Sequence, residues 1–128
     1  MRISFAFIFL LLLNSCSSYS PVEIPGFDSD AFKKDRGGCN NYRITQFETL
    51  KKQKDLLLGA SENQIIQTLG RYDYQILDKK NQKVFIYFLE KGPQCEFIQN
   101  PTTSEAMVIY LNSVSLTKEV LFQKGNPQ

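Results

Sequence analysis

The chain has 128 residues, a formal net charge of +2 and no histidine. This length suits one small domain, and the nearly balanced charge excludes the basic stripe of a nucleic-acid-binding protein. Without histidine, catalytic machinery of the Ser-His-Asp, Cys-His and histidine-metal types is ruled out. The sequence also contains no P-loop, dinucleotide fingerprint or G-x-S-x-G motif. We therefore expect neither a nucleic-acid partner, nor a metal, nor an enzymatic activity.

The first residues follow the order of an export signal. Arg2 precedes an apolar run from Ile3 to Leu13, which only Ser4 interrupts. A positive start, an apolar core and small or polar residues before a possible cleavage site are typical of secretory signals. The run is shorter than the roughly 20 residues of a membrane-spanning helix. The pattern predicts a signal peptide over residues 1–15.

The end of this segment, Leu13-Asn14-Ser15-Cys16, resembles the lipobox of bacterial lipoproteins, although Asn14 is unusual at its position. The resemblance implies that Cys16 becomes the mature N-terminus and carries a diacylglyceryl group and an N-acyl chain. We expect no other cofactor. Two or three acyl chains would hold the protein stably on a membrane. By resemblance to lipoprotein sorting, Ser17 favours the outer membrane, with the domain on its periplasmic face.

The two remaining cysteines form an even pair. With Cys16 acylated, only Cys39 and Cys95 are left, in a compartment that is oxidising. The alternative is a metal site, but the chain offers no histidine and no neighbouring cysteine to complete one. We therefore predict a disulfide between Cys39 and Cys95.

Composition divides the mature chain into a tether, one domain and a tail. Residues 16–27 are predicted to form a lipidated N-terminus and flexible tether, because serine, proline and glycine dominate there. The domain is expected over residues 28–123, followed by a loose tail over residues 124–128. At its start, Asp28-Ser29 is predicted to cap a short helix over residues 30–35, and two glycines form a turn before Cys39.

A second helix is predicted before Gly59. Thr45 and Glu48 have the T-x-x-E spacing of a capping box, in which each side chain satisfies a free backbone amide. Apolar residues then recur at helical spacing, and Gly59 stands where a helix-ending glycine is common.

A third helix is predicted directly after it. Ser61 and Gln64 form another capping box, Ile65 and Leu69 lie on its apolar face, and Gly70 ends it. Because the link between the two helices is short, we expect a helical hairpin or elbow.

After Gly70 the apolar pattern changes to that of strands. Apolar and β-branched runs separated by polar turns predict an antiparallel meander of three to four strands. Helices followed by such a meander indicate an α+β fold in two layers. The predicted strands are residues 72–77, 82–90, 106–111 and 114–122. The aromatic residues of this sheet have two interpretations. Either they form an exposed binding face, or one set lies in the core and the other is partly covered by the helices or a loop. These residues are Tyr72, Tyr74, Phe85, Tyr87 and Tyr110.

Residues 58–73 resemble the G-x(5)-V-x(3)-LG-x-P signature of the BamE (SmpA/OmlA) family of small outer-membrane lipoproteins. Gly59, Ile65, Leu69 and Gly70 occupy the motif positions, while Tyr72 stands where proline is usual. The resemblance extends over residues 45–122 and implies a BamE-like fold of helices packed on a small antiparallel meander. The motif residues are helix terminators and core positions, so they specify fold and not activity.

The sequence thus predicts a non-enzymatic accessory lipoprotein with an envelope protein as its partner, in outer-membrane protein assembly or envelope integrity. The alternative is a periplasmic inhibitor or ligand-binding module on the same fold. A third possibility, an unrecognised hydrolase, depends on carboxylates such as Asp35, Asp73 and Glu90 coming together.

Overall fold

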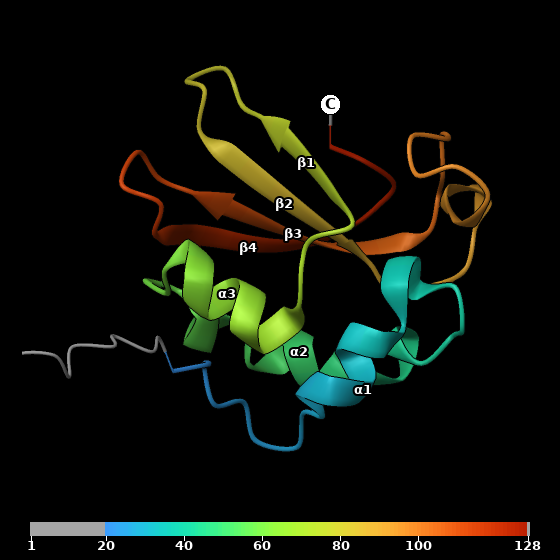
Figure 1. Cartoon of the computed structure of the whole chain (residues 1–128), viewed down its shortest axis with the longest axis horizontal. Coiled ribbons are helices and arrows are strands. Elements are labelled where there is room, and N and C mark those ends of the chain that lie inside the picture. The colour runs from blue at the N-terminus through green and yellow to red at the C-terminus, as the bar shows by residue number, and fades with distance from the viewer. Residues whose placement is uncertain (1–19, 128) are drawn as a thin grey trace, which may run out of the picture.

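A four-stranded antiparallel sheet with helices packed on one face forms the domain (Figure 1). The computed structural model describes residues 20–127. The strands are β1 (Tyr74–Leu77), β2 (Lys83–Phe88), β3 (Glu105–Leu111) and β4 (Thr117–Lys124), and they lie in chain order across the sheet. This confirms the predicted α+β class and the antiparallel meander.

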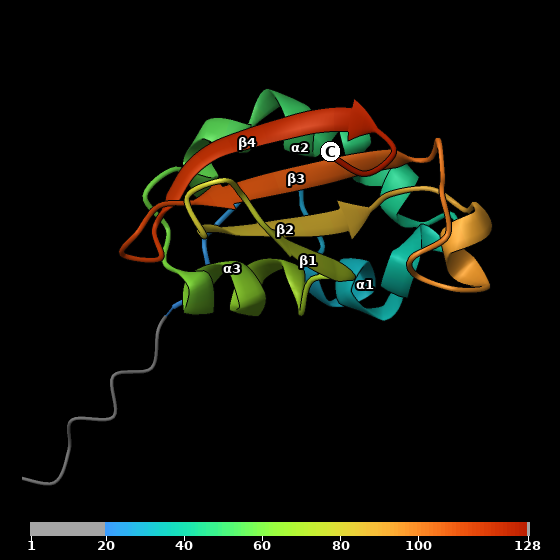
Figure 2. The same ribbon diagram turned by 90° about the horizontal axis from the view of Figure 1, so that it is seen from above.

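The helices are all short. Three are α-helices: α1 (Ser29–Lys34), α2 (Phe47–Lys52) and α3 (Glu62–Leu69). Four are single 3₁₀ turns: η1 (Arg36–Gly38), η2 (Arg43–Gln46), η3 (Lys54–Leu57) and η4 (Pro93–Cys95). Seen from above, α1 and α3 lie along the β1 side of the sheet, and α2 lies behind β4 (Figure 2).

The third predicted helix is confirmed with its caps. Gln64 N donates to Ser61 Oγ over 3.2 Å, and Ser61 N donates to Gln64 Oε1 over 3.0 Å, which is the reciprocal pattern of a capping box. Ile65 and Leu69 are buried in the core. The helix ends at Gly70, whose φ of +83° a side chain would strain.

The predicted second helix is wrong in its start and its continuity. The Asp35 carboxylate accepts hydrogen bonds from the backbone amides of Tyr42 and Arg43, so the chain already turns at η2 before Thr45. Thr45 Oγ1 donates to Tyr42 O instead of capping, and the segment divides into η2, α2 and η3. Because α3 packs chiefly against α1, no helical hairpin forms.

Two predicted chain ends are also corrected. The expected tether does not reach residue 27, because Val22 N donates to Thr68 Oγ1 over 2.8 Å and Ile24 is buried in the core. The expected tail is shorter, because β4 continues to Lys124 and the buried Gly125 donates its amide to Ser104 O. Residues 1–19, with the predicted signal peptide and lipidated N-terminus, and residue 128 lie outside the described part of the chain.

The sheet is apolar on both faces. Side chains that alternate along the strands divide into a larger cluster under the helices and a smaller one on the other face. Tyr87 and Phe85 belong to the first, and Tyr72 stacks on Phe85 with ring centroids 4.4 Å apart. Tyr74 and Tyr110 pack at the edge of the second. The aromatic residues are therefore divided between two core faces and form no single binding face.

Candidate functional site

A buried arginine joins the helices to the sheet. Arg43 is fully buried, and its Nη1 donates to Asp73 Oδ2 over 2.6 Å and to Phe88 O over 3.1 Å. Its Nε donates to Phe32 O over 2.9 Å, and the guanidinium lies 4.4 Å from the centre of the Phe32 ring. Within the described residues Nη2 has no acceptor. Arg43 therefore depends on these few contacts to offset the cost of burying its charge.

Two of the three carboxylates considered from the sequence meet at this arginine. Asp73 also accepts from the amides of Gly37 and Phe88, and its side chain is 1% exposed. Asp35 accepts from three backbone amides, including that of Arg43. Glu90 is engaged elsewhere, with the amide of Glu105. Asp73 is thus occupied by a guanidinium and two backbone amides, and Asp35 by three backbone amides, so both carboxylates fix the position of neighbouring backbone segments.

The predicted disulfide between Cys39 and Cys95 is confirmed, with Cα atoms 5.8 Å apart. It ties the turn after α1 to the loop between β2 and β3. Gly38 makes this approach possible, since a Cβ there would lie 2.6 Å from the Leu89 carbonyl carbon. Gln94 Nε2 donates to the carbonyl oxygens of Gly37 and Glu90, which holds the two loops together beside the bond.

A hollow of about 330 Å³ lies beside the disulfide. Arg36 and Asp73 line it, and their charged atoms are 3.8 Å apart. Arg36 is the more exposed partner, with 59% of its side chain accessible. The Asp73 carboxylate also pairs with the buried Arg43, so the charged groups at this hollow belong to the ion pairs that join the helices to the sheet.

Burial raises the pKa of the Tyr87 hydroxyl well above its ordinary value, and the neighbouring Asp73 carboxylate raises it further. Tyr87 Oη therefore stays protonated and donates to Gly70 O over 2.8 Å. This bond joins the end of α3 to the end of β2. It gives Gly70 a second structural role, which its position in the sequence motif does not reveal.

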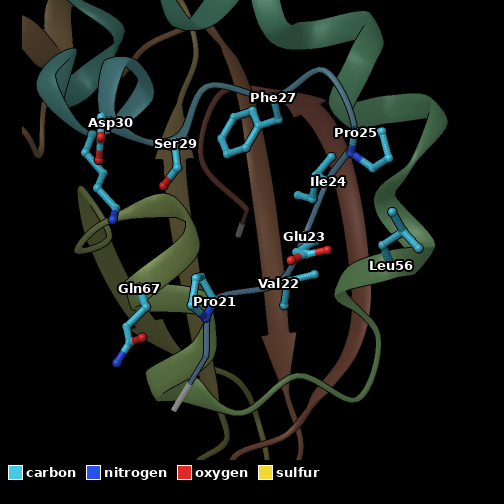
Figure 3. Close-up of a pocket in the computed structure, with 11 residues that line it drawn as sticks. Pro21, Val22, Glu23, Ile24, Pro25, Phe27, Ser29, Asp30, Leu56 and Gln67 are labelled. Carbon is cyan, nitrogen blue, oxygen red and sulfur yellow. The ribbon is translucent and has the colours of Figure 1, made fainter. Parts of the chain in front are cut away.

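The larger hollow, of about 650 Å³, lies on the helical side; we name it the N-terminal groove. Figure 3 shows the segment from Pro21 to Phe27 arching between α1 and α3 on one side and η3 on the other. Its walls are mainly apolar, and Leu56 of η3 projects there with 48% of its surface exposed. The apolar lining residues are Pro21, Val22, Ile24, Pro25, Phe27 and Leu56, and the polar ones are Glu23, Ser29, Asp30, Lys33 and Gln67.

The groove is held open by contacts to the chain segment that forms it. Val22 is fixed to Thr68 as described above, and Gln53 Nε2 donates to Pro25 O over 2.9 Å. Ser29 Oγ donates to Thr68 O over 2.6 Å. Sequence reasoning missed this site because serine, proline and glycine are equally common in flexible tethers. The alternation of Val22, Ile24 and the half-buried Phe27 with polar or turn residues is the signal that points to packing.

The other motif residues identified from the sequence have structural roles. Gly59 donates its amide to Thr117 O over 2.8 Å, which joins the end of η3 to β4. Ile65, Leu69 and Gly70 lie in or at the core, as described above. Cys16 lies outside the described residues. No helix within residues 20–127 has the length and apolar character needed to cross a bilayer.

Within residues 20–127, no group of three or more cysteine or acidic side chains is placed to hold a metal ion. No protein-family model, curated protein or solved structure matches the chain.

Proposed function

We propose that this protein is a non-enzymatic lipoprotein with a BamE-like domain, anchored through Cys16 on the periplasmic face of the outer membrane. It binds another envelope protein there. The observation that carries the binding role is the N-terminal groove, an open apolar surface built on the first residues after the proposed anchor. The Cys39–Cys95 disulfide supports the location, because such bonds persist in oxidising compartments.

The groove has the chemistry of a docking site for an apolar segment. Aliphatic and proline side chains form its walls, and Glu23, Asp30 and Lys33 stand among them. Protein interfaces combine an apolar centre with a polar rim in this way. An apolar anchor of the partner would cover Leu56, which is otherwise half exposed to solvent.

A second candidate is a ligand-binding or inhibitory module that uses the same groove. Its volume of about 650 Å³ lies within the range of small-molecule sites, which is roughly 300–1,000 Å³. Polar groups beside the apolar walls, such as Ser29 and Gln67, would orient a ligand.

A photo-crosslinking amino acid placed at Leu56 is expected to capture an envelope protein in intact cells. The same amino acid at Phe97 is the matched control, because Phe97 is also exposed, at 58%, but lies in the loop after η4. Mass spectrometry of the adducts identifies the partner. A discrete adduct at Leu56 and none at Phe97 supports protein binding. If neither position yields one, protein docking in the groove is refuted and the ligand-binding candidate is favoured.

A Cys16→Ala variant is expected to lose the anchor. Since the thiol is the atom that receives the diacylglyceryl group in lipoproteins, the variant should be released from membranes or remain as uncut precursor. Membrane fractionation and the intact mass of the wild-type chain measure this. A variant that is processed and stays membrane-bound would contradict the proposed lipidation.

A further inference from the structure

Four exposed aliphatic side chains lie outside the groove and project from one end of the sheet. They are Leu58, Leu77, Val114 and Leu116, exposed by 47%, 55%, 69% and 37%; we name them the aliphatic tip. None belongs to the middle of a strand or helix: Leu77 ends β1, Leu58 follows η3, and the other two lie in the turn between β3 and β4. Leucine and valine at successive turns expose apolar surface that the fold itself does not use.

Backbone contacts bring these turns together. Leu116 pairs with Ser61 in an isolated antiparallel bridge, and the adjoining Ala60 accepts the amide of Thr117. Leu77 lies opposite Lys83 in the sheet register, and Lys83 binds Glu62 at the start of α3 over 3.0 Å. In both views the β1–β2 turn, the β3–β4 turn and the start of α3 lie at the same end of the molecule (Figures 1 and 2).

The described chain begins at this end as well. Gln64, in the first turn of α3, donates its Nε2 to Ser20 O over 3.3 Å. Ser20 follows Cys16 by four residues. A fully extended chain spans at most about 3.5 Å per residue, so these four residues reach about 14 Å. A lipid on Cys16 therefore keeps Ser20, which is bonded to the first turn of α3 at this end of the domain, within about 14 Å of the bilayer surface.

The charges around the tip suit a phospholipid surface. Glu62 and Asp78 are paired with Lys83 and Lys118, which offsets the negative charge nearest the turns. Lys79 and Lys80 are exposed in the β1–β2 turn. Apolar side chains beside lysines are the pattern of segments that lie in the membrane interface, where the lysines contact lipid phosphates.

We propose that the aliphatic tip docks on the phospholipid surface that carries the anchor, with Val114 inserted among the lipid headgroups. The inference rests on the lipidation of Cys16 proposed above. Docking fixes the orientation of the domain, so that the sheet end faces the lipid and the disulfide end faces away from it. With docking, the domain contacts the membrane at two places, the lipid on Cys16 and the aliphatic tip.

The chain contains no tryptophan, so one introduced tryptophan reports on one position. The mature protein carrying Val114→Trp is purified from membranes and reconstituted in vesicles of phosphatidylethanolamine and phosphatidylglycerol. The tryptophan emission is expected to shift to shorter wavelength than that of the same domain after proteolysis has released it from the vesicles into detergent-free buffer. Brominated lipids in the vesicles are expected to quench the emission. Phe97→Trp is the control, because Phe97 lies at the disulfide end and is also exposed, by 58% against 69% for Val114, and it should show neither effect.

Intact mass and flotation with the vesicles are measured on the same samples. If the chain is lipidated and floats but Val114→Trp keeps the emission of a water-exposed indole, docking is overturned and the anchor stands. If both tryptophans are quenched alike, the domain has no fixed orientation and docking is again overturned. A chain without lipid on Cys16 refutes the anchor and, with it, the docking that depends on it.

Discussion

Serine at both Cys39 and Cys95 should lower the free energy of unfolding by about 4 kcal/mol. The bond joins residues 56 positions apart, and closing so long a loop removes much of the conformational entropy of the unfolded chain. A domain of this size has a total stability of about 5–15 kcal/mol, so the loss is a large share of it. Urea denaturation under non-reducing conditions, followed by circular dichroism, measures the change.

The reduced wild-type protein is the control for this double variant. Its unfolding midpoint should fall to that of the variant, and the reductant should leave the variant itself unchanged, because only the disulfide responds to it. A single Cys39→Ser variant should also melt at a lower temperature than the wild type. Equal midpoints for wild type and double variant, or two reactive sulfurs in a free-thiol assay of the untreated protein, would contradict the structure.

Local sequence signals predicted the parts of the fold that local contacts determine. Ser61 and Gln64 are three residues apart and satisfy each other's backbone amides, so their pattern is legible without the rest of the chain. The polar β1–β2 turn is equally local, since Asp78 Oδ1 accepts from the amides of Lys80 and Gln82. The disulfide followed from counting, once Cys16 was assigned to the lipid.

Prediction failed where a hydrogen-bond partner that the local pattern does not include determines the conformation of the backbone. The capping box predicted at Thr45 does not form, because the Asp35 carboxylate accepts hydrogen bonds from the amides of Tyr42 and Arg43. Asp35 belongs to no capping pattern in the sequence. The start of β4 was predicted at Val114 because its residues are apolar. The Asn112 side chain instead accepts the amides of Val114 and Leu116 and lengthens the turn up to Thr117.

The candidate site was predictable only in part. The sequence identifies the anchor residue as an expectation, whereas the N-terminal groove arises from segments that meet only in three dimensions, Pro21–Phe27 and Leu56. The ion pair between Arg43 and Asp73 was missed for a related reason. Its members lie 30 positions apart, and single charged residues in a sequence are read as solvated by default.

Replacing Arg43 by Met is expected to destabilise the domain by about 3–5 kcal/mol. The substitution leaves the Asp73 carboxylate, 1% exposed, without its charged partner at 2.6 Å, and it removes the guanidinium donor from the carbonyl oxygens of Phe32 and Phe88. Asp73→Asn should cost a similar amount, because the buried guanidinium then faces a neutral amide. Urea denaturation at neutral pH measures both variants.

The double variant Arg43→Met/Asp73→Asn separates the ion pair from mere loss of packing. Because neither charge is then left alone in the interior, its destabilisation should be much smaller than the sum of the two single effects. Arg36→Gln is the matched control: Arg36 faces the same carboxylate at 3.8 Å, but its side chain is 59% exposed, so the loss should stay within about 1 kcal/mol. Additive single effects, or an Arg36 effect as large as that of Arg43, would show that Arg43 acts through its packing on Phe32 and not through its charge.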